Sequence, residues 1–332
     1  MERLPASASR GGTVFTVADF LEAGRARLSL SVLAGEERMG RVIEEPILNR
    51  PGLALTGFYK DFESRRIQVM GNAEVSYVES LPHDERVKRI RGFMTYRPAL
   101  IVFTNDRKPM PESVPIAEEH GTVIMSTPLS TRRFTHHSYF ILDHLAAPKT
   151  TIYGTMIEVC GLGVLLESDP GIGKSETALG LLRRGAALIA DDLTCIRKDS
   201  AISELYGSAS SSTAGFMEIR GIGIIHVPSI FGVDAVRGEK RLQLVITFKS
   251  FEEIRSEVDR IGQMRHSREI LGVKVPNIII PVSEGRDLVN LVETAAQQYK
   301  LILSGRDPAA QLSMRLRSRA DGTQLPNLIS TI

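Results

Sequence analysis

One stretch decides the fold of this chain: Glu167-Ser168-Asp169-Pro170-Gly171-Ile172-Gly173-Lys174-Ser175-Glu176-Thr177. The apolar segment 163–166 before it has the length of a buried strand. Residues 177–185 after it have the apolar spacing of a helix, which two arginines and a glycine end. Strand, glycine-rich turn, Gly-Lys-Ser and helix follow one another in the order of a phosphate-binding P-loop. We therefore expect an α/β domain built around this turn.

Phosphate chemistry explains the residue types in this stretch. Glycines let successive backbone N–H groups point into one concavity, where the helix N-terminus adds partial positive charge. Lys174 supplies a mobile charge for the outer phosphates, and the Ser175 hydroxyl is a ligand for Mg²⁺. The usual pattern starts with a glycine where this chain has Ser168, which costs backbone freedom only if that residue needs a positive φ. The predicted nucleotide-binding residues are Ser168, Asp169, Pro170, Gly171, Ile172, Gly173, Lys174 and Ser175.

Composition limits the class of protein. The chain has 332 residues, of which 42% are hydrophobic and 24% charged, as in a globular protein of about two domains. A net charge of +2 argues against nucleic acid as a partner. The two cysteines form neither a disulfide framework nor a metal-ligand spacing, which favours a reducing compartment. No apolar run has the length of a membrane span, and the N-terminus lacks a secretory signal. We expect a cytoplasmic protein with no membrane partner.

Alternating strands and helices predict two domains joined by a connecting segment. The first is a small α/β domain over residues 1–130, in which Thr16 and Asp19 have the spacing of a helix cap. No group of carboxylates, cysteines or glycines suggests chemistry there, so we expect a docking or assembly domain. Residues 131–150 form the connecting segment, with surface histidines, and residues 151–325 form the P-loop domain. Strands are expected in the first domain at 28–33, 67–70, 99–104 and 123–126.

Two further blocks carry polar residues that suit phosphate chemistry. The buried strand 186–190 ends in Asp191-Asp192, and carboxylates at a strand tip beside a P-loop commonly position Mg²⁺ and the nucleophile. Neighbours on a strand face opposite ways, so only one of the two faces the phosphates unless the strand has already ended. The block 217–226 places Glu218 and Arg220 beside glycines, which suits metal or phosphate contacts.

These blocks together resemble the HPr kinase/phosphorylase family. The resemblance rests on Ser168–Leu179 followed by Leu188–Asp192, on Glu218–Ile225, and on Pro281–Arg286, in the order and spacing of that family. It covers residues 150 to 300, whereas the N-terminal half agrees only in length and alternating pattern. The family's fold is a P-loop domain related to the phosphoenolpyruvate carboxykinase core, behind a smaller N-terminal α/β domain.

The resemblance implies a bifunctional bacterial regulator of carbon metabolism. Such enzymes use ATP to phosphorylate a serine of the small phosphocarrier protein HPr. They also remove that phosphate by attack of inorganic phosphate (Pi), which yields pyrophosphate (PPi). The implied cofactors are ATP and Mg²⁺, with Pi and PPi as co-substrates. The implied partner is HPr, and the implied assembly is a homo-hexamer.

Residue roles carry over from the resemblance position by position. Lys174 binds the β- and γ-phosphates, while Ser175 and Glu218 hold Mg²⁺. Asp192 is the general base for the serine, Asp191 supports it, and Arg260 neutralises the transferred phosphoryl group. We expect Asp191 and partial burial to raise the pKa of Asp192, which suits proton return in the reverse reaction. The loop implied in phosphorolysis comprises Pro281, Val282, Ser283, Glu284, Gly285 and Arg286.

The chain departs from the family's pattern at two positions. Ser168 replaces the first P-loop glycine, and Tyr153 stands where members usually carry a catalytic histidine. Tyrosine keeps its proton until about pH 10, whereas histidine titrates near neutral pH. Tyr153 can therefore orient a phosphate but is a poor proton shuttle. We expect a shifted balance between the two activities.

Two alternatives remain open at this stage. The first is a P-loop kinase or ATPase that acts on a small molecule, against which the Asp pair and the block 281–286 argue. The second is a nucleotide-binding sensor that has lost catalysis or retains it in one direction. Retention of Lys174, Ser175, Asp192, Glu218 and Arg260 favours an enzyme over a sensor.

Overall fold

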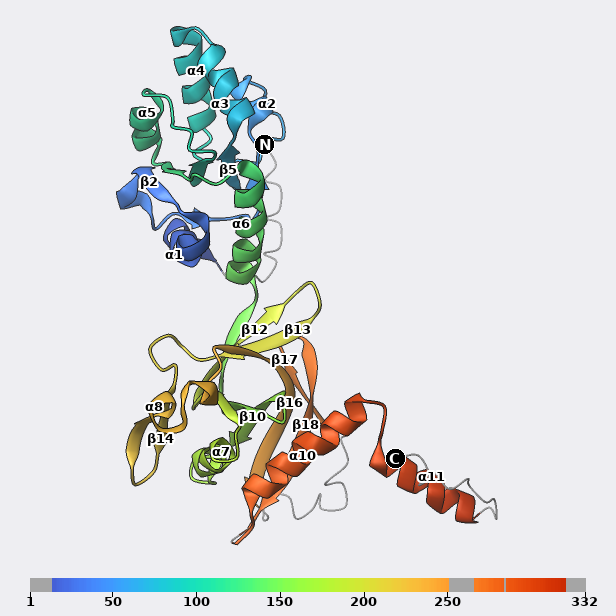
Figure 1. The fold of residues 1–332 in the computed structure, drawn as a ribbon. Coiled ribbons are helices and arrows are strands. Elements are labelled where there is room, and N and C mark those ends of the chain that lie inside the picture. The colour runs from blue at the N-terminus through green and yellow to red at the C-terminus, as the bar shows by residue number, and fades with distance from the viewer. Residues whose placement is uncertain (1–13, 251–265, 284, 321–332) are drawn as a thin grey trace, which may run out of the picture. The chain divides into compact units, whose positions relative to one another are not determined.

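The computed structural model describes residues 14–250, 266–283 and 285–320. The chain divides into two compact units, Met1–Pro148 and Lys149–Ile332 (Figure 1). Unit 1 contains β1 (Phe15–Thr16), α1 (Val17–Leu28), β2 (Ser31–Ala34), η1 (Glu36–Arg38), β3 (Val42–Ile43), β4 (Leu48–Asn49), α2 (Gly52–Leu55), β5 (Ile67–Met70), α3 (Asn72–Ser80), α4 (His83–Met94), β6 (Leu100–Phe103), α5 (Ser113–His120), β7 (Val123–Ser126) and α6 (Thr131–Ala146).

Unit 1 is a sheet covered by helices on both faces. Five of its described strands form a sheet in the order β2-β7-β6-β5-β4, in which β4 to β7 are parallel and β2 is antiparallel to β7, and β1 and β3 form a separate antiparallel pair. Alternate residues of β6 face opposite apolar clusters: Leu100 packs with α1 and α6, and Ile101 packs with α2 to α5. This is the three-layer arrangement expected for a parallel sheet with both faces buried.

Helix α1 begins where its capping signal predicts. Thr16 accepts a hydrogen bond from the Asp19 backbone N–H, and the Asp19 side chain accepts one from the Thr16 backbone N–H. The strand predicted from residue 28 is wrong at its start, because Leu28 is the last residue of α1. Phe20, Gly24 and Leu28 are all buried at a spacing of four, so the helical period continues to that point.

Residues 131–150, expected as a connecting segment, are placed mainly in unit 1. Helix α6 occupies Thr131–Ala146, and Phe134, Ile141 and Leu142 of this helix are buried in the cluster with α1. The chain then enters unit 2 with a strand that starts at Lys149.

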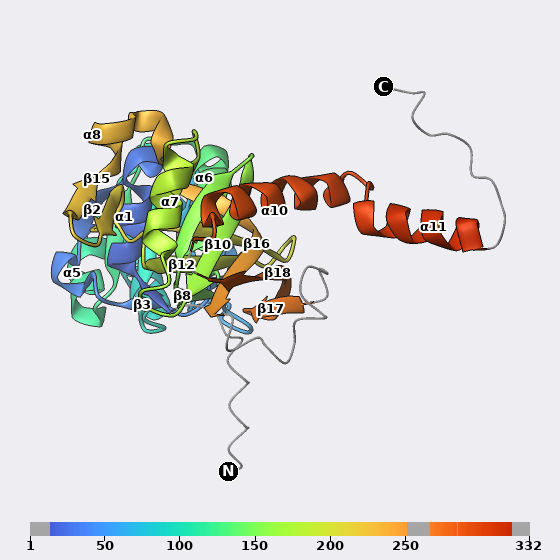
Figure 2. The same cartoon turned by 90° about the horizontal axis from the view of Figure 1, so that it is seen from below.

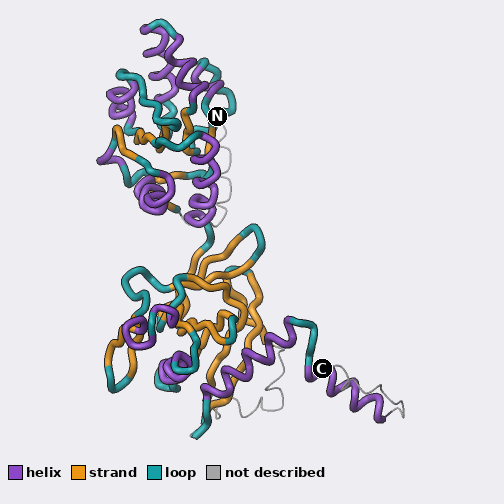
Figure 3. Tube along the Cα trace, in the orientation of Figure 1, coloured by secondary structure: helices purple, strands orange, loops and turns teal. Residues whose placement is uncertain are grey.

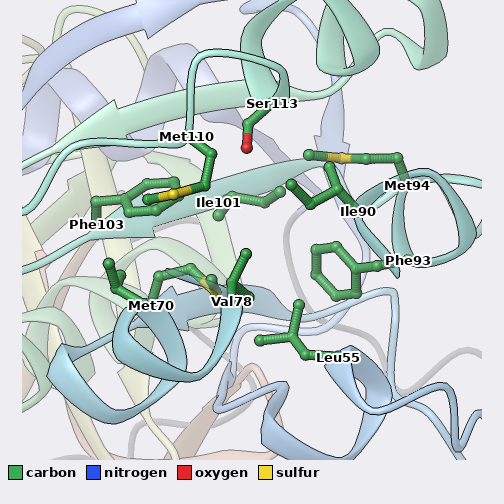
Figure 4. A pocket seen from close by; sticks show the side chains of 11 residues that line it. Leu55, Met70, Val78, Ile90, Phe93, Met94, Ile101, Phe103, Met110 and Ser113 are labelled. Carbon is green, nitrogen blue, oxygen red and sulfur yellow. The ribbon is translucent and has the colours of Figure 1, made fainter. Parts of the chain in front are cut away.

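A small cavity lies in unit 1, on the face of the five-stranded sheet that helices α2 to α5 cover. Its volume is about 20 Å³, and its lining is apolar apart from Ser113. In Figure 4 the side chains of α3, α4, β5 and β6 converge on it. The lining residues are Leu55, Met70, Val75, Val78, Ile90, Phe93, Met94, Ile101, Phe103, Met110 and Ser113.

Unit 2 is built mainly from strands (Figure 3). Its elements are β8 (Lys149–Tyr153), β9 (Thr155–Val159), β10 (Leu162–Ser168), α7 (Lys174–Leu182), β11 (Ala187–Ala190), β12 (Leu193–Asp199), β13 (Glu204–Ser208), β14 (Phe216–Ile219), β15 (Gly223–His226), α8 (Val227–Phe231), η2 (Val233–Ala235), β16 (Glu239–Ser250), β17 (His266–Ile270), β18 (Val273–Val282), α10 (Leu288–Leu303) and α11 (Pro308–Ala320).

The sheet of unit 2 brings four strand ends to one edge. Within the described residues, seven strands run in the order β11-β9-β10-β16-β13-β12-β8, and β18 and β17 extend the sheet from β16. Strands β10, β16 and β18 are parallel, and β11 has the same direction because both β10 and β11 are antiparallel to β9. Their carboxyl ends therefore meet, and this edge is where α/β proteins bind ligands.

Helices α7 and α10 cover one face of this sheet, side by side (Figure 2). Ala178 and Leu181 of α7 and Val292 and Ala296 of α10 share one apolar cluster with the strands. The residue that lets the two helices approach is Gly180, because a Cβ there would lie 2.5 Å from Cγ2 of Val289. Among the described residues, none of the helices has the length and apolarity needed to cross a membrane.

Candidate active site

The P-loop connects the end of β10 to the start of α7. Gly171 and Gly173 have φ angles of 89° and 93°, which lie in the left-handed region that favours glycine. Helices α1, α6 and α10 are capped by the side chains of Thr16, Ser130 and Asp287, whereas no described side chain caps α7. The first backbone N–H groups of α7 therefore have no helical acceptor, and an anion can satisfy them.

Ser168 occupies its position without strain. It is the last residue of β10, paired with Phe248 of β16, so its backbone is extended. The positive φ angles that the loop needs come three and five residues later, at Gly171 and Gly173. A serine in place of the first P-loop glycine therefore leaves the shape of the phosphate cradle unchanged.

The two adjacent carboxylates have different environments. Strand β11 ends at Ala190, so Asp191 and Asp192 lie in the connection to β12, and Asp192 has a φ of 55°. The Asp192 side chain is 58% exposed, and its Oδ1 accepts a hydrogen bond from Lys174 Nζ at 2.9 Å. Asp191 has other partners: its Oδ1 accepts from Thr155 Oγ1 at 2.7 Å and its Oδ2 from the Glu218 backbone N–H at 3.1 Å.

Asp191 is the more buried of the two carboxylates, whereas partial burial was expected for Asp192. Burial raises the pKa of Asp191, the hydrogen bonds from Thr155 and the Glu218 N–H lower it, Asp192 raises it and Lys174 lowers it, with a net rise. The strand topology explains why Asp191 is the more buried residue. The first residue after the strand still lies against β9, whereas the second has left the sheet and reaches the P-loop lysine.

The hairpin β14–β15 places two charged side chains beside the P-loop. Met217 and Ile219 are buried in the cluster under α7, so Glu218 between them points outward, and Arg220 in the turn after β14 is exposed. The Arg220 guanidinium lies over the P-loop, with its nitrogens 3.6 and 3.9 Å from the place that a Cβ on Gly171 would take. The sequence analysis singled out Arg220 as suited to metal or phosphate contacts without assigning it a role, and in the structure it lies in the turn that follows β14.

The residues expected to hold Mg²⁺ fit that ion. Ser175, in the first turn of α7, offers a hydroxyl, and Glu218 offers an exposed carboxylate. Hard oxygen donors of this kind suit Mg²⁺, which commonly binds one or two protein ligands together with substrate phosphates and water. In the parts of the chain that the structure describes, no three His, Cys, Asp or Glu side chains form a protein cage for a metal. Ser175 and Glu218 are thus donors of the type that a metal shared with a nucleotide would use.

The loop 281–286 leaves the sheet at the same edge. Val282 pairs with Ser250 at the carboxyl end of β16, and the loop leads into α10, whose Leu288 lies 3.9 Å from the Cβ position of Gly173. Arg286 donates to the Pro281 carbonyl oxygen at 2.8 Å, which closes the loop on itself. Two predicted site residues, Glu284 of this loop and Arg260, lie outside the described residues.

Tyr153 lies at the end of β8, opposite Leu193 of β12. Its side chain is 80% exposed. The next residue, Gly154, donates its backbone N–H to the Asp192 carbonyl oxygen at 2.8 Å, so Tyr153 is connected directly to the backbone that carries the two carboxylates.

A P-loop, an acidic pair and an Arg-bearing hairpin at the carboxyl edge of one sheet define the catalytic domain of a P-loop kinase. Comparison with known proteins identifies the family. The profile "HPr Serine kinase C-terminal domain" matches residues 144–316, and "HPr Serine kinase N terminus" matches residues 15–142. The chain belongs to the HPr kinase/phosphorylase family.

Relatives match over most of the chain. The HPr kinase/phosphorylase of Leptospira biflexa is 40% identical over 292 residues, which cover 88% of this chain and 90% of the relative. That of Bacillus licheniformis is 36% identical over 290 residues, covering 87% and 93%. The solved structure of the Hpr(Ser) kinase/phosphatase from Coxiella burnetii is 34% identical, covers 47% of this chain and 93% of its own, and has a TM-score of 0.44. The match therefore includes the N-terminal half, where the motifs alone were weak.

Proposed function

We propose that this protein is a bifunctional enzyme that phosphorylates a serine of HPr with ATP and Mg²⁺ and removes that phosphate with Pi, yielding PPi, in the control of carbon metabolism. One observation carries the proposal: Lys174 and Asp192 lie in contact at the mouth of an uncapped helix N-terminus. A phosphate-binding cation and a proton acceptor thus share one place. Membership of the family supports the choice of HPr as the protein substrate.

In the forward direction Lys174 exchanges Asp192 for the outer phosphates of ATP. The freed Asp192 carboxylate takes the proton of the HPr serine as its oxygen attacks the γ-phosphorus, and the bond from that phosphorus to the β-phosphate bridging oxygen breaks. Arg220 neutralises charge on the phosphates above Gly171, and we assign the same task to Arg260 at the transferred group. Mg²⁺, when bound, neutralises further charge and orients the phosphates.

The reverse direction uses the same groups. A Pi oxygen attacks the phosphorus of phosphoserine, the bond to the serine oxygen breaks, and the protonated Asp192 returns its proton to that oxygen. Phosphoryl transfer depends on positioning and charge neutralisation more than on covalent help, so one site can serve both reactions. We assign the loop 281–286 to this direction because it leaves the sheet beside the P-loop.

The experiment combines purified protein, ATP, Mg²⁺ and HPr, with phosphoserine detected by intact mass, and then adds Pi and measures PPi. We expect HPr to gain one phosphate and to lose it again as PPi appears. Lys174→Ala abolishes both steps. The matched control is Lys198→Ala, which keeps both steps, because the Lys198 ammonium contacts the Leu271 carbonyl oxygen in the wild type. Nucleotide binding without any change in HPr would contradict the proposal and leave a sensor or a kinase of another substrate.

We also propose a cytoplasmic homo-hexamer, as the resemblance to the family implies. Cys160 and Cys195 are both free thiols, which suits a reducing compartment. Sedimentation equilibrium of the full chain measures the assembly, and a mass other than six chains would contradict the hexamer.

A further inference from the structure

The carboxylate of Asp191 joins three separate segments of unit 2. Its Oδ1 accepts from the Thr155 hydroxyl of β9, and its Oδ2 accepts from the Glu218 backbone N–H of β14. Thr155 is fully buried. Both carboxylate oxygens of Asp191 thus accept hydrogen bonds from protein donors.

We propose that Thr155 and Asp191 are positioning residues that fix the β14–β15 hairpin over the P-loop and thereby place Glu218 and Arg220. The inference rests on the proposed function for its activity measurements. It gives Asp191 a role distinct from that of its neighbour Asp192, and it adds Thr155 to the residues on which the site depends.

The hairpin needs such a tie because strand pairing does not supply one. Among the described strands, β14 pairs with β15 alone, in a two-stranded sheet separate from the nine-stranded sheet that carries the P-loop. Met217 and Ile219 pack beneath α7, but apolar packing is non-directional. A hydrogen bond has a preferred distance and angle, so the bond from Glu218 N–H to Asp191 sets the register of the outward side chains.

The Thr155 end of this tie is itself held rigidly. The residue before it, Gly154, donates to the Asp192 carbonyl oxygen at 2.8 Å and accepts from Thr194 Oγ1 at 2.8 Å. A Cβ on Gly154 would lie 2.8 Å from the Leu166 carbonyl oxygen, so the backbone there is closely packed on β10. The frame that holds β14 is therefore continuous with the strand that leads into the P-loop.

Asparagine distinguishes positioning from chemistry at Asp191. In Asp191→Asn the amide oxygen can accept from the Glu218 N–H, and the NH₂ group can donate to Thr155 Oγ1. The two hydrogen bonds that tie Thr155 and Glu218 to residue 191 are kept, while the negative charge is lost. Asp191→Ala removes both bonds, and Thr155→Val removes one without changing the size of the side chain. Thr155→Ser keeps the hydroxyl.

The experiment measures two quantities on the full chain: amide hydrogen exchange at Glu218 without nucleotide, and the Mg²⁺ concentration for half-maximal HPr phosphorylation. We expect Asp191→Ala and Thr155→Val to speed exchange at Glu218 and to raise the Mg²⁺ requirement by about tenfold or more, the usual effect of losing an outer-shell partner. Asp191→Asn and Thr155→Ser stay near the wild type in both. Thr247→Val, which loses a hydrogen bond to Asn277 on the other face of the sheet, controls for loss of a threonine hydroxyl.

Two results would overturn the inference. In the first, Asp191→Asn loses as much HPr phosphorylation as Asp191→Ala, although amide exchange at Glu218 in Asp191→Asn equals that of the wild type. That result would mean that the negative charge of Asp191 takes part in the chemistry. The other is unchanged exchange at Glu218 in Asp191→Ala. Because exchange is measured without nucleotide or HPr, it still tests the frame if the wild-type chain fails to phosphorylate HPr, and that failure would count against the proposed function alone.

Discussion

Lys174 Nζ and Asp192 Oδ1 lie 2.9 Å apart, so the proposed phosphate-binding cation and the proposed base form an ion pair with each other. Lys174 is 15% exposed and Asp192 58% exposed. Water therefore reaches the Asp192 side of this pair, whereas the Lys174 side chain is mostly buried. We expect the more highly charged phosphates of ATP to displace Asp192 from Lys174, which would release the carboxylate when a nucleotide is bound.

Asp192→Asn should abolish transfer in both directions while leaving nucleotide affinity intact. The amide cannot accept the serine proton, so we expect kcat to fall by about 10²- to 10⁴-fold for phosphorylation and phosphorolysis alike. The affinity for ATP should be kept or increase, because Lys174 no longer has to leave a carboxylate. Calorimetry and HPr phosphorylation rates measure the two effects. Asp199→Asn, at the far end of β12, is the matched control. A variant that kept either activity would show that Asp192 is not the base.

Tyr153→His should shift the balance of activities toward phosphorolysis. A histidine exchanges protons near neutral pH, whereas tyrosine does not. Because the Tyr153 side chain is 80% exposed, the substitution has room without repacking. We expect the ratio of Pi-dependent to ATP-dependent rates to rise by up to about 10²-fold, the lower end of general acid–base effects. Tyr139→His, an exposed tyrosine of α6, should leave the ratio unchanged, and an equal ratio in Tyr153→His would contradict the prediction.

Gly180→Ala should weaken the packing of α10 on α7. The added Cβ would lie 2.5 Å from Cγ2 of Val289, which is stiff because it is β-branched. Overpacking of this kind costs about 1–3 kcal/mol, against a gain of about 1 kcal/mol in helix propensity. Val289→Ala removes the clashing methyls, so the double variant should recover part of the loss in free energy of unfolding. Urea denaturation measures the free energy of unfolding of each variant. If the losses in Gly180→Ala and Val289→Ala simply added in the double variant, the contact between the two residues would be contradicted.

Val78→Ile should stabilise unit 1 by filling its cavity. The cavity of about 20 Å³ has room for about one methyl group, and Val78 lines it (Figure 4). We expect a gain of about 0.5–1 kcal/mol, typical of cavity filling, seen as a higher Tm. Val17→Ile is the control, since Val17 is fully buried in the other apolar cluster, where an added methylene overpacks the core. Equal loss of stability in both variants would contradict the cavity's role.

The local signals of the chain were readable from sequence because each depends on residues close together along it. The cap formed by Thr16 and Asp19 is a spacing of three, and the P-loop is a single turn whose glycines adopt positive φ angles. Backbone geometry of this kind follows from residue type alone.

Contacts between distant segments were decided only by the tertiary structure. The sequence placed Asp191 and Asp192 together, but the pairing of β11 with β9 determined that Asp191 is the more buried of the two and Asp192 the partner of Lys174. The same holds for Arg220 beside Gly171, since the packing of a separate hairpin against the P-loop leaves no periodic signal in the chain. Residue type and spacing thus determined the chemistry that this protein can perform. Packing of segments far apart in the chain decided which of two adjacent carboxylates contacts Lys174, because burial and hydrogen-bond partners exist only once the sheet has formed.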